Sequence, residues 1–302
     1  MASQGKLIIV GTPIGNLGDL SPRAVEAFRA ADAVCCEDTR VTGKLLSAAG
    51  VSRPLIRCDE NVIAGRAPSL VDRMLAGETL AFASDAGMPG VSDPGQVLVD
   101  AAREAGVSVE VVPGPVACVT ALVASGIPCD HFFFEGFLPR KAGERVRRLQ
   151  QLMTVPGALL FYESPHRVAA TLESVASVFP TRVAALCREL TKLHEEVLRA
   201  PAPELASQVA ARIEEPVRGE CVVVVAPPSA EEQAEMAART AAGMSVLSVD
   251  GAAPDPEEAL RADIAEGLAS GEPANALAKR LAQKYSRRKR EVYALILASE
   301  GN

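Results

Sequence analysis

The sequence predicts an α/β protein made of two α/β subdomains and a small C-terminal helical module. Short β-branched runs alternate with longer helical patterns over most of the chain. The chain has 302 residues, more than one core usually holds, and 48% of them are hydrophobic. Proline-rich breaks at Pro113–Pro115 and from Pro227 onward divide it into segments of ordinary domain size.

Seven strands are predicted from apolar, β-branched runs. In chain order they are Lys6–Val10, Thr79–Ser84, Val107–Val112, His131–Phe134, Ala158–Tyr162, Val183–Cys187 and Cys221–Val225. The clearest helical patterns between them are Val97–Ala105, Glu144–Met153 and Val168–Phe179. A further helix opens at Pro22, with Ser21 as its N-cap. Such alternation predicts mainly parallel strands with helices on the sheet faces.

The breaks predict subdomains at residues 1–114 and 115–227, a linker at 228–256 and a helical module at 257–302. The linker is rich in Ala, Glu and Pro, with room for a short helix near Glu231–Thr240. The module is expected to contain helices Ala274–Lys284 and Arg287–Ala298, the second capped by Ser286.

The net charge of −7 argues against indiscriminate binding to nucleic acid. Two segments are nevertheless basic: Pro139–Gln150 contains five Lys or Arg and one Glu, and Lys279–Arg290 contains seven and no acid. Such segments suit a structured anionic partner, but solvated helix faces explain them equally well.

The seven cysteines are odd in number and form no Cys-x-x-Cys motif, which indicates buried thiols in a reducing compartment. No apolar stretch has the length of a membrane span, and no signal pattern opens the chain. The expected location is therefore the cytoplasm, with no membrane association.

Polar and glycine-rich loops follow several predicted strands, where open α/β sheets bind their ligands. The loop Gly11–Asp19 has three glycines but neither a Gly-x-Gly-x-x-Gly nor a P-loop spacing, so a simple tight turn is an equal alternative. In Ser84–Gly95, Asp93 is expected to cap the following turn, whereas Asp85 suits ligand binding and turn capping alike.

Two loops in the second half, Phe161–Arg167 and Arg188–Glu196, combine acids, bases and hydroxyls. Their histidines, His166 and His194, share no helix face, so no metal site is expected. No Ser-His-Asp or Cys-His arrangement follows from the spacing.

Eight segments, in order along the chain, resemble the motifs of the ribosomal RNA small subunit methyltransferase I family. They are Gly11–Asp19, Glu37–Arg40, Ser84–Pro89, Ser92–Gly95, Pro113–Pro115, Phe134–Pro139, Tyr162–Arg167 and Arg188–Lys192. The matched region covers about residues 6–226, and the C-terminal helices are similar to the family's extra module more loosely. This sequence departs from the family at Pro115–Ala117, which lacks a serine, and at Arg57–Asn61, which lacks a histidine.

The resemblance implies the tetrapyrrole-methylase (class III methyltransferase) fold, with S-adenosylmethionine between two α/β subdomains and a homodimer as the usual assembly. It also implies the reaction: 2′-O-methylation of cytidine 1402 in 16S rRNA, within the decoding region of the small ribosomal subunit.

Site residues are expected on these loops. A ribose hydroxyl needs a base or an acceptor for its proton, and Glu163, Glu189 and Glu60 are the candidates. Lys192 or Arg188 is expected to hold the phosphate beside the target ribose. The alternative is a mechanism in which the protein only positions the reactants. The expected cofactor-binding residues are Thr12, Pro13, Gly15, Asp85, Ala86, Met88, Val116, Ala117, Tyr162 and Leu190. The expected RNA-binding residues are Arg140, Lys141, Arg145, Arg147, Arg148, Arg287, Arg288, Lys289 and Arg290.

Two other functions stay open, because fold does not determine substrate. One is methylation of a tetrapyrrole or another small molecule by the same fold. The other is a non-enzymatic ribosome-assembly protein that binds a nucleotide-like ligand. The basic segments and the appended helices favour RNA.

Overall fold

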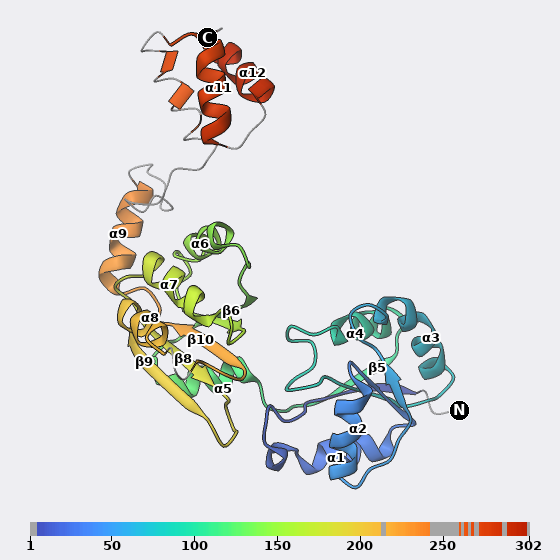
Figure 1. Cartoon of the computed structure of the whole chain (residues 1–302). Helices are drawn as coiled ribbons and strands as arrows, with labels where there is room; N and C mark the ends of the chain where they lie inside the picture. Colours follow the sequence, from blue (N-terminus) through green and yellow to red (C-terminus); the bar gives the residue numbers. More distant parts are fainter. Residues whose placement is uncertain are drawn as a thin grey trace. The chain divides into compact units, whose positions relative to one another are not determined.

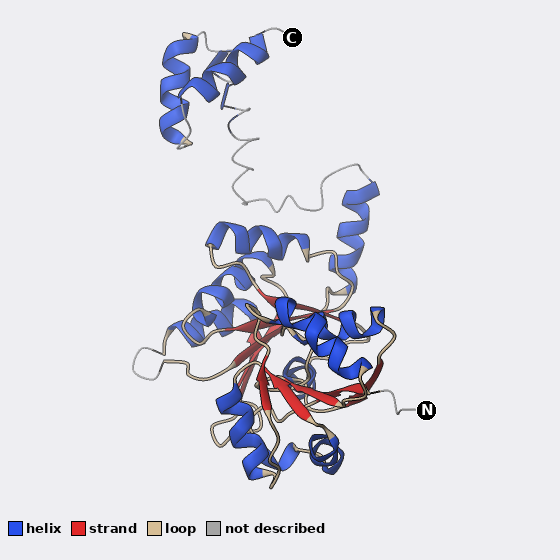
Figure 2. Ribbon diagram, turned by 90° about the vertical axis from the view of Figure 1, so that its right-hand side faces the viewer, coloured by secondary structure: helices blue, strands red, loops and turns tan. Residues whose placement is uncertain are grey.

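The computed structural model describes residues 5–212, 216–241, 260, 263–264, 267–268, 272–285 and 289–300. Residues 1–244 and 245–302 form two compact units. The larger unit contains two five-stranded sheets with helices packed on them (Figures 1 and 2), which confirms the predicted α/β class.

The first sheet is parallel throughout, in the order β3-β2-β4-β1-β5. Its strands are β1 Lys6–Val10, β2 Ala33–Cys36, β3 Leu55–Arg57, β4 Leu80–Ala83 and β5 Ser108–Val112. The apolar patterns did not predict β2 and β3, nor the strand Glu196–Pro201 of the second sheet. The four residues of β2 are all buried and show no alternation, and β3 has only three residues at the edge of the sheet.

Helices cover both faces of this sheet. They are α1 Pro22–Ala30, α2 Thr39–Ala48, α3 Ile63–Leu75 and α4 Gly95–Glu104, with a 3-10 turn η1 at Leu17–Asp19. Alternate residues of β1 point to opposite faces: Leu7 packs with α3 and α4, and Ile8 packs with α1 and α2. The predicted cap is confirmed, since the Ser21 side chain accepts a hydrogen bond from the Ala24 amide.

The second sheet has the order β6-β7-β10-β8-β9. Its strands are β6 Phe132–Phe137, β7 Ala158–Glu163, β8 Val183–Arg188, β9 Glu196–Pro201 and β10 Cys221–Val225. Only β6 and β7 pair in parallel; the other pairings are antiparallel, so the expectation of mainly parallel strands is wrong here. The connection 189–195 is too short for a parallel crossover, and β8 and β9 therefore form a hairpin.

Five helices complete the larger unit: α5 Ala117–Ser125, α6 Ala142–Gln151, α7 Val168–Val178, α8 Ala202–Ala210 and α9 Ala230–Ala241. The first four pack on the two faces of the second sheet. The last, α9, occupies the early part of the predicted linker, and residues 242–256 lie outside the described residues. The boundaries 1–114, 115–227, 228–256 and 257–302 stay a proposal.

The smaller unit has a helical core. Helix α11 spans Ala274–Lys284, as predicted, and α12 spans Lys289–Glu300, against a prediction of Arg287–Ala298. The proposed cap Ser286 lies outside the described residues. The core joins Leu277 and Leu281 of α11 to Val292 and Ile296 of α12.

All seven cysteines are free thiols, and all but Cys129 are buried. In the ranges that the structure describes, no helix is both long enough and apolar enough to span a bilayer.

The β8–β9 hairpin contains an ion-paired carboxylate that makes stability depend on pH. Glu196 accepts hydrogen bonds from Arg212 at 2.7 and 2.9 Å and from Arg188 at 2.6 Å. The hydrogen bonds from Arg212, the larger effect, and from Arg188 lower the pKa of Glu196 to about 2.

Because the folded-state pKa is depressed, the stabilisation is complete above the ordinary glutamate pKa and is lost as the pH falls toward about 2. We expect Glu196→Gln to lower the free energy of unfolding by about 1 kcal/mol at pH 7, after allowing for solvent screening. The difference from the parent protein should shrink between pH 5 and pH 3 in denaturant titrations. A difference independent of pH would contradict this role.

Candidate active site

A cavity of about 390 Å³ lies in the larger unit, within the usual range for small-molecule sites. Loops from both sheets line it. The lining residues from the first half of the chain are Ile14, Glu37, Ser84, Ala86, Gly87, Met88, Val91, Ser92, Asp93, Val116 and Ala117. From the second half they are Phe137, Tyr162, Glu163, Ser164, Pro165, Leu190, Gly219, Glu220, Cys221 and Val222.

The loop after β1 contributes Ile14 to the lining, and its Thr12 supports the neighbouring loop after β4. The buried Thr12 donates its amide to the Gly87 carbonyl oxygen at 2.9 Å. Its hydroxyl lies 3.3 Å from the carbonyl oxygen of Ser84 and 3.2 Å from that of Gly87. Thr12 therefore holds the loop after β4 in shape without itself lining the cavity.

Gly11 and Gly114 let the backbones of the loops after β1 and β5 come into contact. A Cβ atom on Gly11 would lie 2.5 Å from the Gly114 Cα, a distance that real Cβ atoms do not adopt. The backbone torsion φ of Gly87 is +83°, and a Cβ there would lie 3.1 Å from a methyl carbon of Ile14. These motif glycines therefore serve close approach between loops.

Among the lining residues from the second half of the chain, Tyr162 lies near the end of β7 and is surrounded by aromatic rings. Its ring centroid is 4.7 Å from that of Phe134 and 5.8 Å from that of Phe137, both edge to face. Burial, chiefly, raises the pKa of the Tyr162 phenol, so the hydroxyl stays protonated at neutral pH.

The start of β10 is the part of the wall that sequence analysis missed. Strand β10 runs antiparallel to β7, and Cys221 pairs with Glu163. The amino end of β10 therefore lies at the same sheet edge as the carboxyl end of β7. The expectation from the sequence was for loops after carboxyl ends of strands, and nothing in the sequence alone shows the direction of β10.

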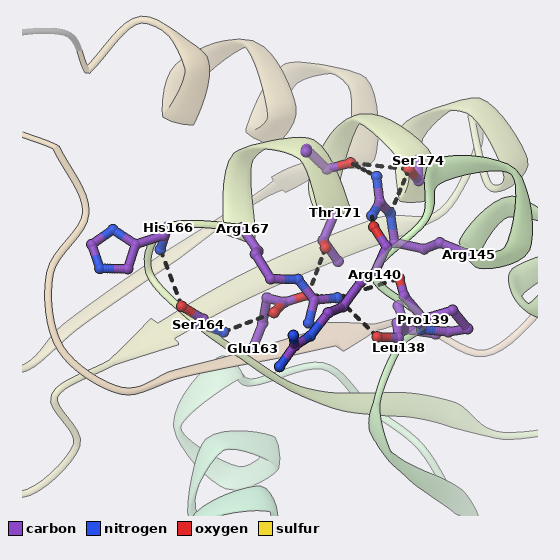
Figure 3. Close-up of polar contacts among 11 residues, drawn as sticks. Leu138, Pro139, Arg140, Arg145, Glu163, Ser164, His166, Arg167, Thr171 and Ser174 are labelled. Atoms are coloured by element: carbon purple, nitrogen blue, oxygen red, sulfur yellow. Dashed lines mark hydrogen bonds and ion pairs between the residues drawn. The ribbon is translucent and has the colours of Figure 1, made fainter.

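Glu163 lines the cavity and is buried, with a relative exposure of 3%. Figure 3 shows its polar contacts. Its carboxylate accepts hydrogen bonds from the Ser164 amide at 2.8 Å and the Thr171 hydroxyl at 2.6 Å. Arg167 forms an ion pair with it at 3.4 Å and donates to the Leu138 carbonyl oxygen at 2.8 Å. With three groups already bonded, this carboxylate is better suited to fixing the wall than to accepting a proton.

The predicted pair Glu189 and Lys192 lies beside the cavity lining. The Lys192 ammonium bonds Glu189 at 2.9 Å and Glu220 at 2.8 Å. The hydrogen bond from Lys192 holds the pKa of Glu189 below its usual value. The side chain of Lys192 also covers Gly15, where a Cβ would lie 2.5 Å from its Cγ. Lys192 thus joins the loop after β1 to the second sheet.

The remaining catalytic candidate, Glu60, is exposed in the turn after β3 and does not line the cavity. Among the predicted cofactor residues, the lining includes Ala86, Met88, Val116, Ala117, Tyr162 and Leu190. Thr12, Pro13, Gly15 and Asp85 are not part of it.

The two aspartates of the loop after β4 have different partners. Asp85 accepts a hydrogen bond from the Asp38 amide at 3.1 Å, so it braces the turn after β2. Asp93 accepts from the amides of Gly90 at 2.6 Å and Gly95 at 2.7 Å, which confirms its predicted capping role.

The basic segment around α6 is only partly available to a partner. Arg140, Lys141 and Arg147 are exposed, whereas Arg148 is half-buried and bonds Glu135 at 2.6 Å. The prediction that Arg145 faces RNA is corrected, because this residue is only 5% exposed.

Arg145 shares the inner face of α6 with the buried Leu149, four residues further on. It donates to the Ser174 hydroxyl at 2.9 Å and to the carbonyl oxygens of Ala170 and Arg140, each at 3.2 Å (Figure 3). In the C-terminal unit, Lys289 and Arg290 are exposed, and Arg287 and Arg288 lie outside the described residues.

Within the described part of the chain, no group of three His, Cys, Asp or Glu residues is arranged to hold a metal ion.

Comparison with known proteins is consistent across sequence and structure. Residues 6–206 match the family Tetrapyrrole (Corrin/Porphyrin) Methylases. The chain is 47% identical over 229 residues to the ribosomal RNA small subunit methyltransferase I of Xylella fastidiosa, covering 74% of this chain and 82% of that protein. It is 36% identical over 299 residues to the protein of the same name from Synechocystis, covering 99% of both.

Solved structures show the same fold at lower sequence identity. The methyltransferase CobJ has a TM-score of 0.55 at 20% identity, with 74% of this chain and 94% of that one covered. Uroporphyrin-III C-methyl transferase from Thermus thermophilus, complexed with S-adenyl homocysteine, has a TM-score of 0.51 at 18% identity, with coverages of 74% and 97%. These similarities confirm the predicted tetrapyrrole-methylase fold.

Proposed function

Because this chain belongs to the ribosomal RNA small subunit methyltransferase I family of the tetrapyrrole methylases, we propose that its cavity is the methyl-transfer site of an S-adenosylmethionine-dependent rRNA methyltransferase. The reaction is 2′-O-methylation of the ribose of cytidine 1402 in 16S rRNA, consistent with the name that the relatives have.

One observation carries the assignment: motif loops far apart in the sequence line a single cavity. The first half of the chain contributes residues from the loops after β1, β2, β4 and β5, and the second half contributes the end of β6, the loops after β7 and β8 and the start of β10. A protein that merely shared scattered motifs with the family would not bring them together.

The cavity suits S-adenosylmethionine in size and in lining. Its volume of about 390 Å³ lies in the range for small ligands, and apolar groups such as Val116, Ala117 and Leu190 alternate with polar ones. We propose Ala86, Met88, Val116, Ala117, Tyr162 and Leu190 as direct contacts. Thr12, Pro13, Gly15 and Asp85 would support these contacts from behind, consistent with the hydrogen bonds of Thr12 and Asp85.

S-adenosylmethionine supplies a methyl group already activated by its sulfonium. The chain itself has to orient the donor, exclude water and bring the ribose oxygen into line, which can supply several kcal/mol of the barrier. Close loop packing at Gly11 and Gly114, and the ion pairs of Glu163 and Lys192, connect the loops around the cavity.

Transfer of labelled methyl from S-adenosylmethionine tests the proposal. Small ribosomal subunits from cells lacking this protein should become labelled on the 16S rRNA ribose at cytidine 1402. Label only in a small molecule would support the tetrapyrrole alternative, and no label in any acceptor would support the non-enzymatic one.

We further propose that the exposed basic residues Arg140, Lys141 and Arg147 contact rRNA phosphates. The Arg145 and Arg167 guanidinium groups anchor the carbonyl oxygens of residues 138–140, so this segment is held in place beside the cavity residue Phe137. Lys289 and Arg290 are the corresponding candidates in the C-terminal unit.

Reversing two of these charges should weaken binding to small subunits in a salt-dependent way. For Arg140→Glu with Arg147→Glu, the slope of log affinity against log salt should flatten by about 2, one for each lost phosphate contact. Filter binding across a KCl series measures it. The exposed Arg23, on α1, gives a matched control as Arg23→Glu. Equal slopes for all three proteins would make this surface a solvated helix face.

The homodimer, the cytoplasmic location and the assembled subunit as substrate stay part of the proposal. Sedimentation of the purified protein tests the first. Methyl transfer to naked 16S rRNA and to intact subunits, compared side by side, tests the third.

A further inference from the structure

We propose that Glu37 is the general base that removes the proton of the ribose 2′-hydroxyl, an inference that rests on the function proposed above. Glu37 belongs to the motif Glu37–Arg40, for which the sequence predicted no role. Of the bases predicted from the sequence, Glu60 does not line the cavity, and Glu163 and Glu189 are already bonded.

The position of Glu37 is well defined. It directly follows the buried strand β2 and lines the cavity from the first wall. Its carboxylate accepts the Asp85 amide at 3.4 Å, and Asp85 in turn accepts the Asp38 amide at 3.1 Å. The turn is thus braced from the loop after β4, and the side chain is half-buried.

Four carboxylates line the cavity, and three of them are occupied. Asp93 caps its own turn through two amides, and Glu163 holds Arg167, Thr171 and Ser164. Glu220 bonds the Lys192 ammonium. Glu37 is different: among the described residues, no ammonium, guanidinium or hydroxyl group forms a hydrogen bond or an ion pair with it. It is therefore the lining carboxylate best placed to accept a substrate hydrogen bond.

The surroundings of Glu37 also increase its basicity. Burial, the largest effect, raises the pKa of Glu37; the hydrogen bond from the Asp85 amide lowers it in part, and the negative charges of Asp85, Asp93 and Asp59 raise it further. A carboxylate with a raised pKa is a stronger base and is closer to the optimum for proton transfer near neutral pH.

The step balances without another reactant. As the 2′-oxygen forms a bond to the methyl carbon, the carbon–sulfur bond breaks and its electron pair stays on sulfur. The sulfonium becomes a neutral thioether. The hydroxyl proton passes to Glu37, which returns it to water after the product leaves.

Glu37→Gln tests the proposal, because the amide keeps the shape but does not accept the proton. Under single-turnover conditions with saturating S-adenosylmethionine and unmethylated small subunits, the rate at pH 7.5 should fall about 10²- to 10⁴-fold. Calorimetry should show S-adenosylmethionine affinity within about threefold of the parent protein, and the melting temperature should be unchanged. Glu37→Asp should recover part of the rate.

The pH profile gives a second readout. A base is active when deprotonated, so the parent rate should fall tenfold per pH unit on the acid side of its pKa. In Glu37→Gln this acid limb should be absent. The exposed Glu104 at the end of α4 provides the control, and Glu104→Gln should retain both the rate and the limb.

The outcomes separate the two proposals. If the parent protein transfers no methyl group to rRNA, the proposed function fails. If it does, a Glu37→Gln rate within threefold of the parent, or an unchanged acid limb, overturns the role of Glu37 alone. Loss of S-adenosylmethionine binding in a folded Glu37→Gln would make Glu37 a donor-binding residue and would also overturn it.

Discussion

Replacing Glu163 by alanine should lower the free energy of unfolding by about 3 kcal/mol, because it removes the partner of a largely buried cation. The substitution leaves the Arg167 guanidinium, the Thr171 hydroxyl and the Ser164 amide without their shared acceptor. The side chains of Glu163 and Arg167 are 1% and 26% exposed, so water only partly replaces the lost contacts. For a unit of this size, thermal unfolding should shift downward by roughly 6 to 12 °C.

Glu163→Gln is the matched control. Its amide oxygen still accepts the Thr171 hydroxyl but has no charge to pair with Arg167, so the loss should be smaller than in Glu163→Ala without disappearing. Equal losses would mean that the charge of Glu163, rather than its hydrogen bonds, carries the stabilisation; no loss in either variant would refute the structural role.

The second large effect is expected where α9 joins the second sheet. Arg182 has a side chain only 1% exposed and donates to Glu232 of α9 at 2.5 to 3.1 Å. It also donates to the Met153 carbonyl oxygen at 3.0 Å, and its guanidinium carbon lies 4.5 Å from the centroid of the Phe179 ring. Glu232→Ala would leave this cation buried and uncompensated, at a cost of about 3 to 5 kcal/mol.

Chemical denaturation of the full chain measures this loss, and Glu235→Ala is its control. Glu235 lies on the same helix but is exposed, so its removal should change stability by less than about 0.5 kcal/mol. Adding Arg182→Met to Glu232→Ala should recover most of the loss, because an apolar side chain needs no counter-charge. A Glu232→Ala protein as stable as Glu235→Ala would contradict the inferred cost.

Sequence patterns predicted seven of the described strands and missed β2, β3 and β9. The first two have only four and three residues, and β9 lies at the edge of its sheet and contains Glu, Arg and Pro. The strand Lys6–Val10 and the helix Ala274–Lys284 were predicted with the bounds they have. Strand β2 was missed because its apolar run has only four residues, too few for a clear strand pattern. The failure to predict β2 matters most for the site, because Glu37 directly follows this strand.

Local charge was a poor guide to exposure. The run around Arg145 was predicted to be a basic surface, yet the helical period turns Arg145 inward beside Leu149. The same reasoning applies to Lys192, whose ammonium is shared by two glutamates from different loops. A sequence gives the charge of a residue, whereas only packing shows which partners neutralise it.

By itself, the sequence determined the α/β class, the family and the loops that form the site, because these depend on local patterns and on motif order. Tertiary structure decided which members of those loops face the cavity, since strand direction and loop contacts join residues far apart in the chain. The antiparallel course of β10 brought Gly219–Val222 to the wall. Among the lining carboxylates, ion pairs occupy Glu163 and Glu220 and two backbone amides bind Asp93, which leads to the proposal that Glu37 accepts the proton.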